Sequence, residues 1–316
     1  MSESTIVCIG CSTDADYVFL APLGALLWRD LVRFEPRLFL VGDAAEWQNK
    51  THTRASLNAM HLHGIGHRFI GRLPGYRDST LAQNIRQHAA CDPSIAPDTW
   101  CAMSDADLWP LRRDFYVQHE SSDARCVLLY ANGDHFAGAA ETLRRAAIGQ
   151  AYQSIPTCHV IMRAATWRET YRYISSDPVA SMAWTLGRWL NPKMRKPGND
   201  PGWEAWMSDQ RKLTEALCEQ PWFPEFRVDD KNRDGVYRVG DVLFVTRHGH
   251  PPLDRLDRSL TNDWKVRPYY PRWTDAHLHK NPFNDEHWND TLPVIEYHMP
   301  QHLEWARRYR EEFVAG

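Results

Sequence analysis

Asp105 and Asp107, two carboxylates one residue apart, are the residues of this sequence best suited to chemistry. They follow an apolar run at residues 99–104 that is suited to a β-strand, and Pro110 stands shortly after them. Because proline has no N–H to donate, a strand ladder is expected to stop there. At a strand end the backbone turns, so both carboxylates can converge on one point.

The two aspartates suit a hard divalent cation such as Mg²⁺ or Mn²⁺, because their oxygens have no soft partner nearby. An ion held by so few protein groups takes its other ligands from a phosphorylated substrate. The pair therefore predicts a site for a cation and a diphosphate. The alternative is a solvated turn in which the aspartates cap backbone N–H groups. The order of the surrounding elements favours the first interpretation.

Strands alternate with helices in the first third of the chain. Short apolar runs predict buried strands at residues 5–11, 37–42, 67–71 and 100–104. Apolar residues at helical spacing predict helices at 17–33, 52–64 and 80–91. This alternation predicts an α/β fold with a mainly parallel sheet. Ligands of such sheets gather beyond the carboxyl ends of the strands, where residues 12–14 and 105–107 both fall.

The second half of the sequence is less regular. Strands are expected at residues 126–131 and 159–162, and paired strands within 236–246. Helices are expected at 139–151, 167–175, 203–218 and 303–314, and a loop at 191–202, which is rich in Pro and Gly. We find no repeat and no clean linker, so we expect one domain over residues 1–316.

Composition narrows the class of protein. The hydrophobic content of 43% allows a sizeable core, and a net charge of −3 without a long basic run argues against nucleic-acid binding. Seven scattered cysteines and no apolar leader predict a reduced, cytoplasmic setting. No window is apolar enough to span a membrane. Cys8 and Cys11 have the spacing of a redox or zinc pair, but they fall inside the first expected strand.

Three segments resemble motifs of the GT-A fold glycosyltransferases, most closely the glycogenin-like group that uses nucleotide sugars. Residues 11–17, which run into a long apolar helix, are similar to the segment after the first strand of that group. Residues 104–107 fit its Asp-x-Asp motif, and residues 206–210 resemble its Asp-Gln segment near the transferred sugar. The resemblance covers about residues 5–220 in the order of elements.

The resemblance implies a GT-A, Rossmann-like fold: a mainly parallel central sheet flanked by helices, with an irregular C-terminal extension. It divides the single domain into a nucleotide-binding half at about residues 1–115 and an acceptor or sugar half at about 116–316. The implied activity is the metal-dependent transfer of a hexosyl group from a UDP- or GDP-sugar to a glycan or another hydroxyl acceptor. The group as a whole favours retention at the anomeric carbon.

The resemblance also implies roles for individual residues. The metal ligands, for Mn²⁺ or Mg²⁺, are Asp105, Asp107 and a C-terminal histidine. The residues implied to contact the nucleotide donor are Thr13, Asp14, Tyr17, Arg86, Ser104 and Lys280. Asp209 and Gln210 are implied to act on the transferred sugar and the acceptor.

Two of these assignments are open. Gln83 stands where the group often carries a basic residue near the phosphates, with Arg86 one turn later, so the identity of the phosphate contact is undecided. Two stretches could supply the histidine ligand: residues 247–250, with His248 and His250, and residues 275–280, with His277, His279 and Lys280. We prefer His277, because a lysine for the diphosphate lies close to it.

Other interpretations of the same residues are structural. Asp14 could only cap a helix, Tyr17 could belong to the core, and Arg86 could lie on a solvated helix face. The cluster at residues 254–258, after two prolines, mixes both signs of charge and is expected to be a surface turn or helix with local ion pairs, although contact with an acceptor is an alternative.

Two other functions compete with glycosyl transfer. A sugar nucleotidyltransferase could use a related sheet, but such enzymes place a Gly-rich, basic loop after the first strand, and residues 11–16 contain neither Gly nor Lys or Arg. A non-catalytic carbohydrate-binding protein could keep the same fold. The 14 Trp and 12 Tyr would suit it, because sugars stack on aromatic rings, but these residues also fill cores.

Overall fold

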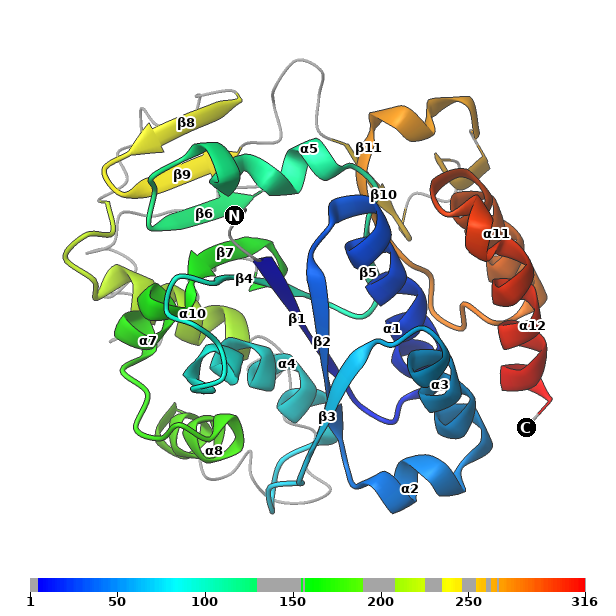
Figure 1. Ribbon diagram of the computed structural model, residues 1–316, viewed down its shortest axis with the longest axis horizontal. Coiled ribbons are helices and arrows are strands. Elements are labelled where there is room, and N and C mark those ends of the chain that lie inside the picture. The colour runs from blue at the N-terminus through cyan, green and yellow to red at the C-terminus, as the bar shows by residue number, and fades with distance from the viewer. Residues whose placement is uncertain are drawn as a thin grey trace.

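A sheet of eight strands forms the centre of the protein, in the order β3-β2-β1-β4-β7-β6-β9-β8 (Figure 1). The computed structural model describes residues 5–129, 155, 157–189, 208–224, 235–245, 254–259, 263–265 and 267–315. The strands of this sheet are β1 (Thr5–Cys11), β2 (Glu35–Val41), β3 (Gly66–Ile70), β4 (Trp100–Ser104), β6 (Cys126–Leu129), β7 (Val160–Arg163), β8 (Val236–Val239) and β9 (Val242–Val245).

The sheet is parallel in its first half and mixed in its second. Strands β3, β2, β1 and β4 run parallel, in agreement with the predicted alternation of strands and helices. Strand β7 lies antiparallel between β4 and β6, and β9 pairs parallel with β6 and antiparallel with β8. The predicted α/β fold with a mainly parallel central sheet is confirmed.

Helices cover both faces of this sheet. They are α1 (Ala15–Leu27), α2 (Ala44–Asn49), α3 (Thr51–Leu62), α4 (Asp78–His88), α5 (Arg113–Tyr116), α7 (Ala164–Tyr171), α8 (Pro178–Trp189), α10 (Ser208–Cys218), α11 (Asp285–His298) and α12 (Leu303–Val314). Side chains of β1 alternate between two apolar clusters, with Val7 and Ile9 in one and Ile6 and Cys8 in the other. Figure 1 shows α1 and α3 on one face and α4, α7, α8 and α10 on the other.

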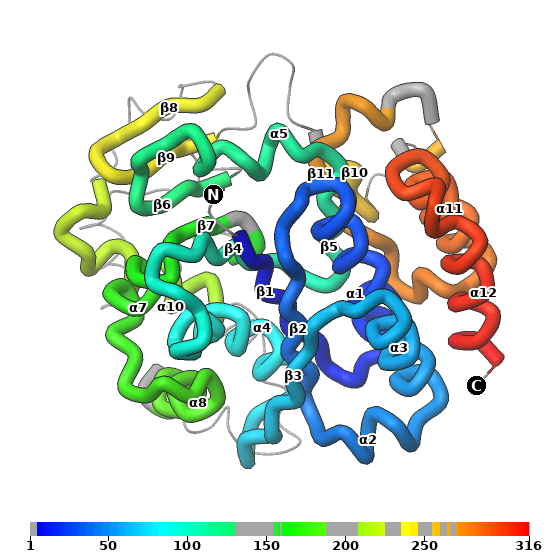
Figure 2. Tube along the Cα trace, in the orientation of Figure 1, coloured from blue at the N-terminus to red at the C-terminus, as the bar shows by residue number. Residues whose placement is uncertain are grey.

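Helix α1 is buried all round, because a second layer covers it. Every residue from 18 to 27 is buried. The ring of Phe19 contacts the rings of Trp288 in α11 and of Tyr309 and Phe313 in α12, at centroid distances of 5.9, 5.2 and 5.0 Å. The trace in Figure 2 accordingly returns at its C-terminal end to lie beside α1. The predicted closing helix at residues 303–314 is α12.

A second, smaller sheet was not predicted. It consists of β10 (Asp254–Asp257), β11 (Trp273–His277) and β5 (Leu108–Pro110), with β11 in the middle. Strand β5 begins directly after the two aspartates and ends at Pro110, where the sequence predicted a stop. This sheet therefore brings segments from the C-terminal part of the chain to the acid pair at the end of β4.

Most other predicted elements are present with small shifts of their ends. The helix predicted at residues 17–33 is divided into α1 and a π-helical turn at Trp28–Val32. The helix predicted at 139–151 and the loop predicted at 191–202 lie outside the described residues. Cys8 and Cys11 are free and buried, so this pair belongs to the core. None of the described helices is both long and apolar enough to cross a bilayer.

Candidate active site

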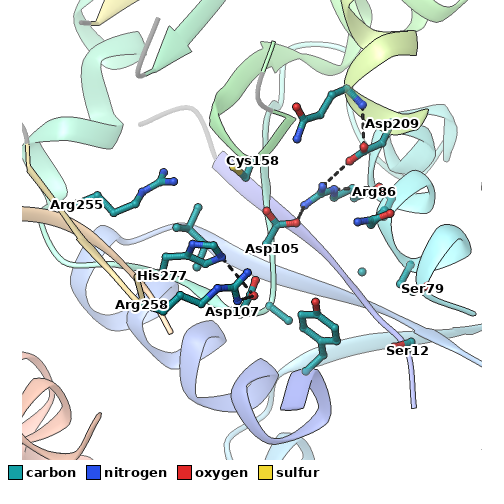
Figure 3. A pocket seen from close by; sticks show the side chains of 17 residues that line it. Ser12, Ser79, Arg86, Asp105, Asp107, Cys158, Asp209, Arg255, Arg258 and His277 are labelled. Carbon is teal, nitrogen blue, oxygen red and sulfur yellow. Dashed lines mark hydrogen bonds and ion pairs between the residues drawn. The ribbon is translucent and has the colours of Figure 1, made fainter. Parts of the chain in front are cut away.

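A cavity of about 270 Å³ opens where β1 and β4 end (Figure 3). The parallel pairing of Ile9 with Ser104 places the ends of these two strands side by side. The wall is completed by α4, by the first turn of α10 and by the small sheet. The position agrees with the rule that ligands of parallel sheets bind beyond the carboxyl ends of the strands.

The cavity gathers residues that are far apart in the sequence. The predicted site residues that line it are Tyr17, Arg86, Asp105, Asp107, Asp209, Gln210 and His277. The polar and charged residues of the wall that were not assigned a role are Ser12, Ser79, Gln83, Cys158, Arg255 and Arg258. The predicted residues Thr13, Asp14, Ser104 and Lys280 lie outside this wall.

One side of the cavity is an ion-paired group that we call the interior cluster: Arg86, Asp105 and Asp209. The side chain of Arg86 is only 3% exposed. One nitrogen, Nη1, is hydrogen-bonded to Asp105, while Nη2 lies 2.8 Å from both Asp209 Oδ2 and Thr157 Oγ1. Burial raises the pKa of the Asp209 carboxyl, and the charge of Arg86 opposes this shift. Arg86 is thus a buried cation shared by two carboxylates, not a residue of a solvated helix face.

The opposite side is the rim cluster: Arg258, Asp107 and His277. Arg258 Nη1 lies 2.9 Å from Asp107 Oδ2, and His277 Nε2 lies 3.5 Å from the same oxygen. The other ring nitrogen of the histidine, Nδ1, lies 3.1 Å from Asp257 Oδ2. Burial alone would raise the pKa of Asp107, but the hydrogen bond from His277 and the charges of both partners lower it to about 2. Asp107 is therefore ionised at neutral pH.

Three residues that were predicted to contact the nucleotide donor make structural hydrogen bonds. Asp14 accepts a hydrogen bond from the N–H of Asp16 at 3.0 Å and so caps α1. The buried hydroxyl of Ser104 donates to the carbonyl of Leu108 at 3.2 Å. The carbonyl of Thr13 lies 3.4 Å from a ring nitrogen of His52. These bonds hold the loop after β1 and the turn after β4.

Tyr17, which lines the cavity, contacts Lys280, which lies outside the cavity wall. Lys280 Nζ lies 4.1 Å from the centre of the Tyr17 ring and donates to its hydroxyl at 2.8 Å. The N–H of Asn281 donates to Asp16 at 2.9 Å, so the loop after β11 is tied to the start of α1. Burial and the nearby carboxylates raise the pKa of the Tyr17 hydroxyl, which therefore stays protonated.

The interpretation of residues 254–258 as a surface turn or helix with local ion pairs is wrong. Residues 254–257 form strand β10, and Arg255 in this strand and Arg258 directly after it both reach the cavity and pair with distant acids. Arg255 donates to both oxygens of Asp275 at 2.8 and 3.1 Å, and Arg258 pairs with Asp107. Alternating charges along a short segment give no apolar signal, so the strand could be recognised only from its pairing with β11.

The four candidate histidines are only partly described. His248 and His250 lie outside the described residues. His279 is 7% exposed, stacks on His287 at 4.6 Å and lies 3.5 Å from Asp290, away from the cavity wall. Of the histidines that the structure describes, only His277 lines the cavity.

The donor set of the cavity fits a divalent cation in its chemistry. It holds two carboxylates and an imidazole whose second nitrogen is held by Asp257, which is how proteins orient metal-binding histidines. As they stand, no three His, Cys, Asp or Glu side chains of the described ranges form a group that could hold a metal ion. Figure 3 shows the reason: Asp105 turns towards Arg86 and Asp107 towards Arg258 and His277.

Comparison with known proteins adds little. No protein-family model and no curated protein matches the sequence. Among solved structures, the galactosyltransferase LgtC, determined in complex with donor and acceptor sugar analogs, is similar over 92% of this chain and 95% of its own chain, with 12% sequence identity and a TM-score of 0.44. A TM-score this low supports no inference about activity, so the case for a function depends on the residues of the cavity.

Proposed function

We propose that this protein is a GT-A-type glycosyltransferase that transfers a sugar from a nucleotide diphosphate to a hydroxyl acceptor. The observation that carries the proposal is the meeting, in one cavity, of Asp105, Asp107 and His277 with Arg86 and Asp209. Such a transfer needs carboxylates that bind a cation, a positively charged side chain that binds the diphosphate, and a carboxylate close to the transferred sugar. The N-terminal half would hold the nucleotide and the C-terminal half the acceptor.

Asp105, Asp107 and His277 are the residues that would hold Mn²⁺ or Mg²⁺. When bound, the ion would act as a Lewis acid for the departing diphosphate. Asp257 would keep the His277 ring oriented, because it lies 3.1 Å from Nδ1 and leaves Nε2 for the ion. The arginines of the wall would add fixed positive charge where negative charge develops.

Asp209 and Gln210 would orient the transferred sugar. Asp209 Oδ2 accepts from Arg86 and Thr157, and Oδ1 accepts from the N–H of Gln210 at 2.8 Å. Both oxygens of this carboxylate are thus held in place, and the retaining reaction is kept from the family resemblance. Gln83 offers a further polar contact, since its buried Oε1 has no hydrogen-bond partner among the described residues and Gln83 lines the wall. A sugar hydroxyl could donate to it.

Calorimetric titration tests the proposal. UDP and GDP should each be titrated into the protein with and without Mn²⁺, and at least one should bind more tightly with the ion. A panel of UDP- and GDP-sugars should then be tested for slow release of the nucleoside diphosphate. The absence of metal-dependent binding for both nucleotides would overturn the proposal.

The two competing functions give different results in the same assays. Release of pyrophosphate from a nucleoside triphosphate and a sugar phosphate would identify a nucleotidyltransferase. Binding of a nucleotide sugar without any hydrolysis or transfer would identify a non-catalytic protein.

A further inference from the structure

Arg258 occupies the oxygen that a metal ion at Asp107 would need. Its Nη1 lies 2.9 Å from Asp107 Oδ2, and His277 Nε2 lies 3.5 Å from the same atom. A divalent ion bound to Asp107 and His277 would therefore compete directly with a guanidinium. A dication and a guanidinium on one carboxylate oxygen repel each other, which favours the release of the guanidinium.

Arg258 is better placed to leave than the other arginines of the wall. Its side chain is 28% exposed, and its contacts in the described part of the chain, to Asp107 and at 3.4 Å to the carbonyl of Leu278, all run through Nη1. Arg86 is 3% exposed and uses Nε, Nη1 and Nη2. Arg255 is held by both oxygens of the fully buried Asp275.

We propose that Arg258 releases Asp107 to the incoming metal ion and transfers its contact to the diphosphate that arrives with the ion. This inference rests on the proposed function and names the residue that couples its two ligands. Guanidinium binds carboxylate and phosphate through the same fork of N–H donors, so one group can serve both partners in turn.

The exchange predicts that the ion and the nucleotide bind cooperatively. An ion that binds alone breaks the Arg258–Asp107 pair and leaves a guanidinium beside a dication without a new partner. A diphosphate supplies that partner, so each ligand strengthens the binding of the other. Linkage requires the same coupling factor in both directions, typically about 5- to 150-fold.

The test measures Mn²⁺ binding itself, from the loss of the electron paramagnetic resonance signal of the free ion. Titrations of the full chain are made without nucleotide and with saturating UDP, and again with GDP. The nucleotide alone is titrated by calorimetry. For the wild type we expect UDP or GDP to raise Mn²⁺ affinity at least about fivefold.

Arg258→Gln should shift the two ligands in opposite directions. Mn²⁺ alone should bind at least about fivefold more tightly, because its competitor is gone, and the metal-free nucleotide should bind at least about fivefold more weakly. The coupling factor should fall towards one. Arg258→Lys keeps the charge without the fork and should fall between the wild type and the glutamine variant. Arg238→Gln, which removes an exposed arginine of the β8–β9 hairpin, is the control and should change neither affinity.

The outcomes separate the inference from the proposed function. If the wild type binds Mn²⁺ with a nucleotide but both Arg258 variants keep the wild-type coupling, or lose affinity for both ligands together, the exchange is wrong and the function stands. If the wild type binds no Mn²⁺ with either nucleotide, both fall.

Discussion

Asp105 and Asp107 are separated by one residue, yet they belong to two clusters with different physical character. The interior cluster holds Asp105 against an arginine that is 3% exposed and is also bonded to Gln83, Thr157 and Asp209. The rim cluster holds Asp107 against an arginine that is 28% exposed and uses a single nitrogen. The contrast indicates that one cation is part of the scaffold and the other can exchange partners.

The difference follows from the elements that supply each cluster. Arg86 comes from the last turn of α4 and Asp209 from the first turn of α10, and these helices pack on the central sheet. Arg258 follows the short edge strand β10 of the small sheet, and His277 ends β11. An edge strand has fewer neighbours to fix its side chains, so the movable cation is on that side.

Loss of either aspartate should have the largest effect. We expect Asp107→Asn and Asp105→Asn each to lower the transfer rate by at least about 10³-fold, because a bound ion contributes several kcal/mol to the stabilisation of the leaving group. The affinity for Mn²⁺ should fall further in Asp107→Asn than in Asp105→Asn, because Asp107 lies beside the second proposed ligand, His277, at 3.5 Å. Donor hydrolysis and Mn²⁺ titration measure both effects, with Asp114→Asn on the surface as the control. Full turnover by the Asp107 variant would refute a role for the rim cluster in catalysis.

The two arginines should differ in their effect on stability. Arg86→Met leaves Asp209, which is 2% exposed, without its counter-charge, and breaking such a buried pair costs about 3–5 kcal/mol. Arg258→Gln breaks a pair in which the arginine is 28% exposed and the buried Asp107 keeps His277 as a partner, so it should cost less, about 1 kcal/mol. Urea unfolding of the two variants measures the difference in the free energy of unfolding. Equal losses would show that the rim arginine is as fixed as the interior one.

The sequence allowed the central sheet to be predicted, but not the small one. The strand predicted at residues 100–104 agrees with β4 at both ends, because five consecutive buried residues give a strong apolar signal. Strand β5 has three residues, and β10 has a single apolar residue, Leu256, between charges. Short segments of this kind are strands only because a partner distant in sequence pairs with them, and one sequence does not reveal that pairing.

The same reason limited the prediction of the site. Asp105 and Asp107 could be found because their spacing and position are themselves the signal. The partners of Arg86 could not be predicted from the sequence, because they depend on how α10 packs against α4. Arg258 has only its charge to distinguish it, and most arginines in charged segments lie on the surface.

A smaller effect on Mn²⁺ binding is expected from substitution of Asp257, which holds the His277 ring of the rim cluster. Asp257→Asn should weaken Mn²⁺ binding by about 10- to 100-fold, because the carboxylate lies 3.1 Å from Nδ1 of His277 and orients the ring that we propose as a metal ligand. The matched control is Asp290→Asn, which removes the carboxylate beside His279, outside the cavity wall. Electron paramagnetic resonance titration in the presence of UDP or GDP measures both variants. Equal weakening by the two substitutions would point to a general loss of charge instead of a specific support for His277.

The smallest predicted effect is a change in stability on substitution of Lys212, a buried lysine close to the interior cluster but not bonded to it. Lys212 lies one turn after Asp209 on α10 and is 4% exposed, but among the described residues its Nζ has no hydrogen-bond partner. Burial lowers the pKa of Lys212 from 10.5 to about 7, and the charge of Asp209 only partly opposes this. Unlike Arg86, it is a buried cation that the fold does not satisfy.

Lys212→Met should therefore stabilise the protein, by about 1 kcal/mol at pH 7. Between pH 7 and 10.5 the unfolded chain holds a proton on Lys212 that the folded chain lacks, so the stability of the wild type rises with pH across this range. The cost of burying the charged lysine is complete below pH 7 and decreases towards pH 10.5. The gain in stability from Lys212→Met should decrease over the same range. Urea unfolding at pH 6.5, 8 and 9.5 measures this trend, with the exposed Lys265→Met as the control. A loss of stability in Lys212→Met at every pH would instead make Lys212 a member of the interior cluster, with a charge that the acids around Arg86 require.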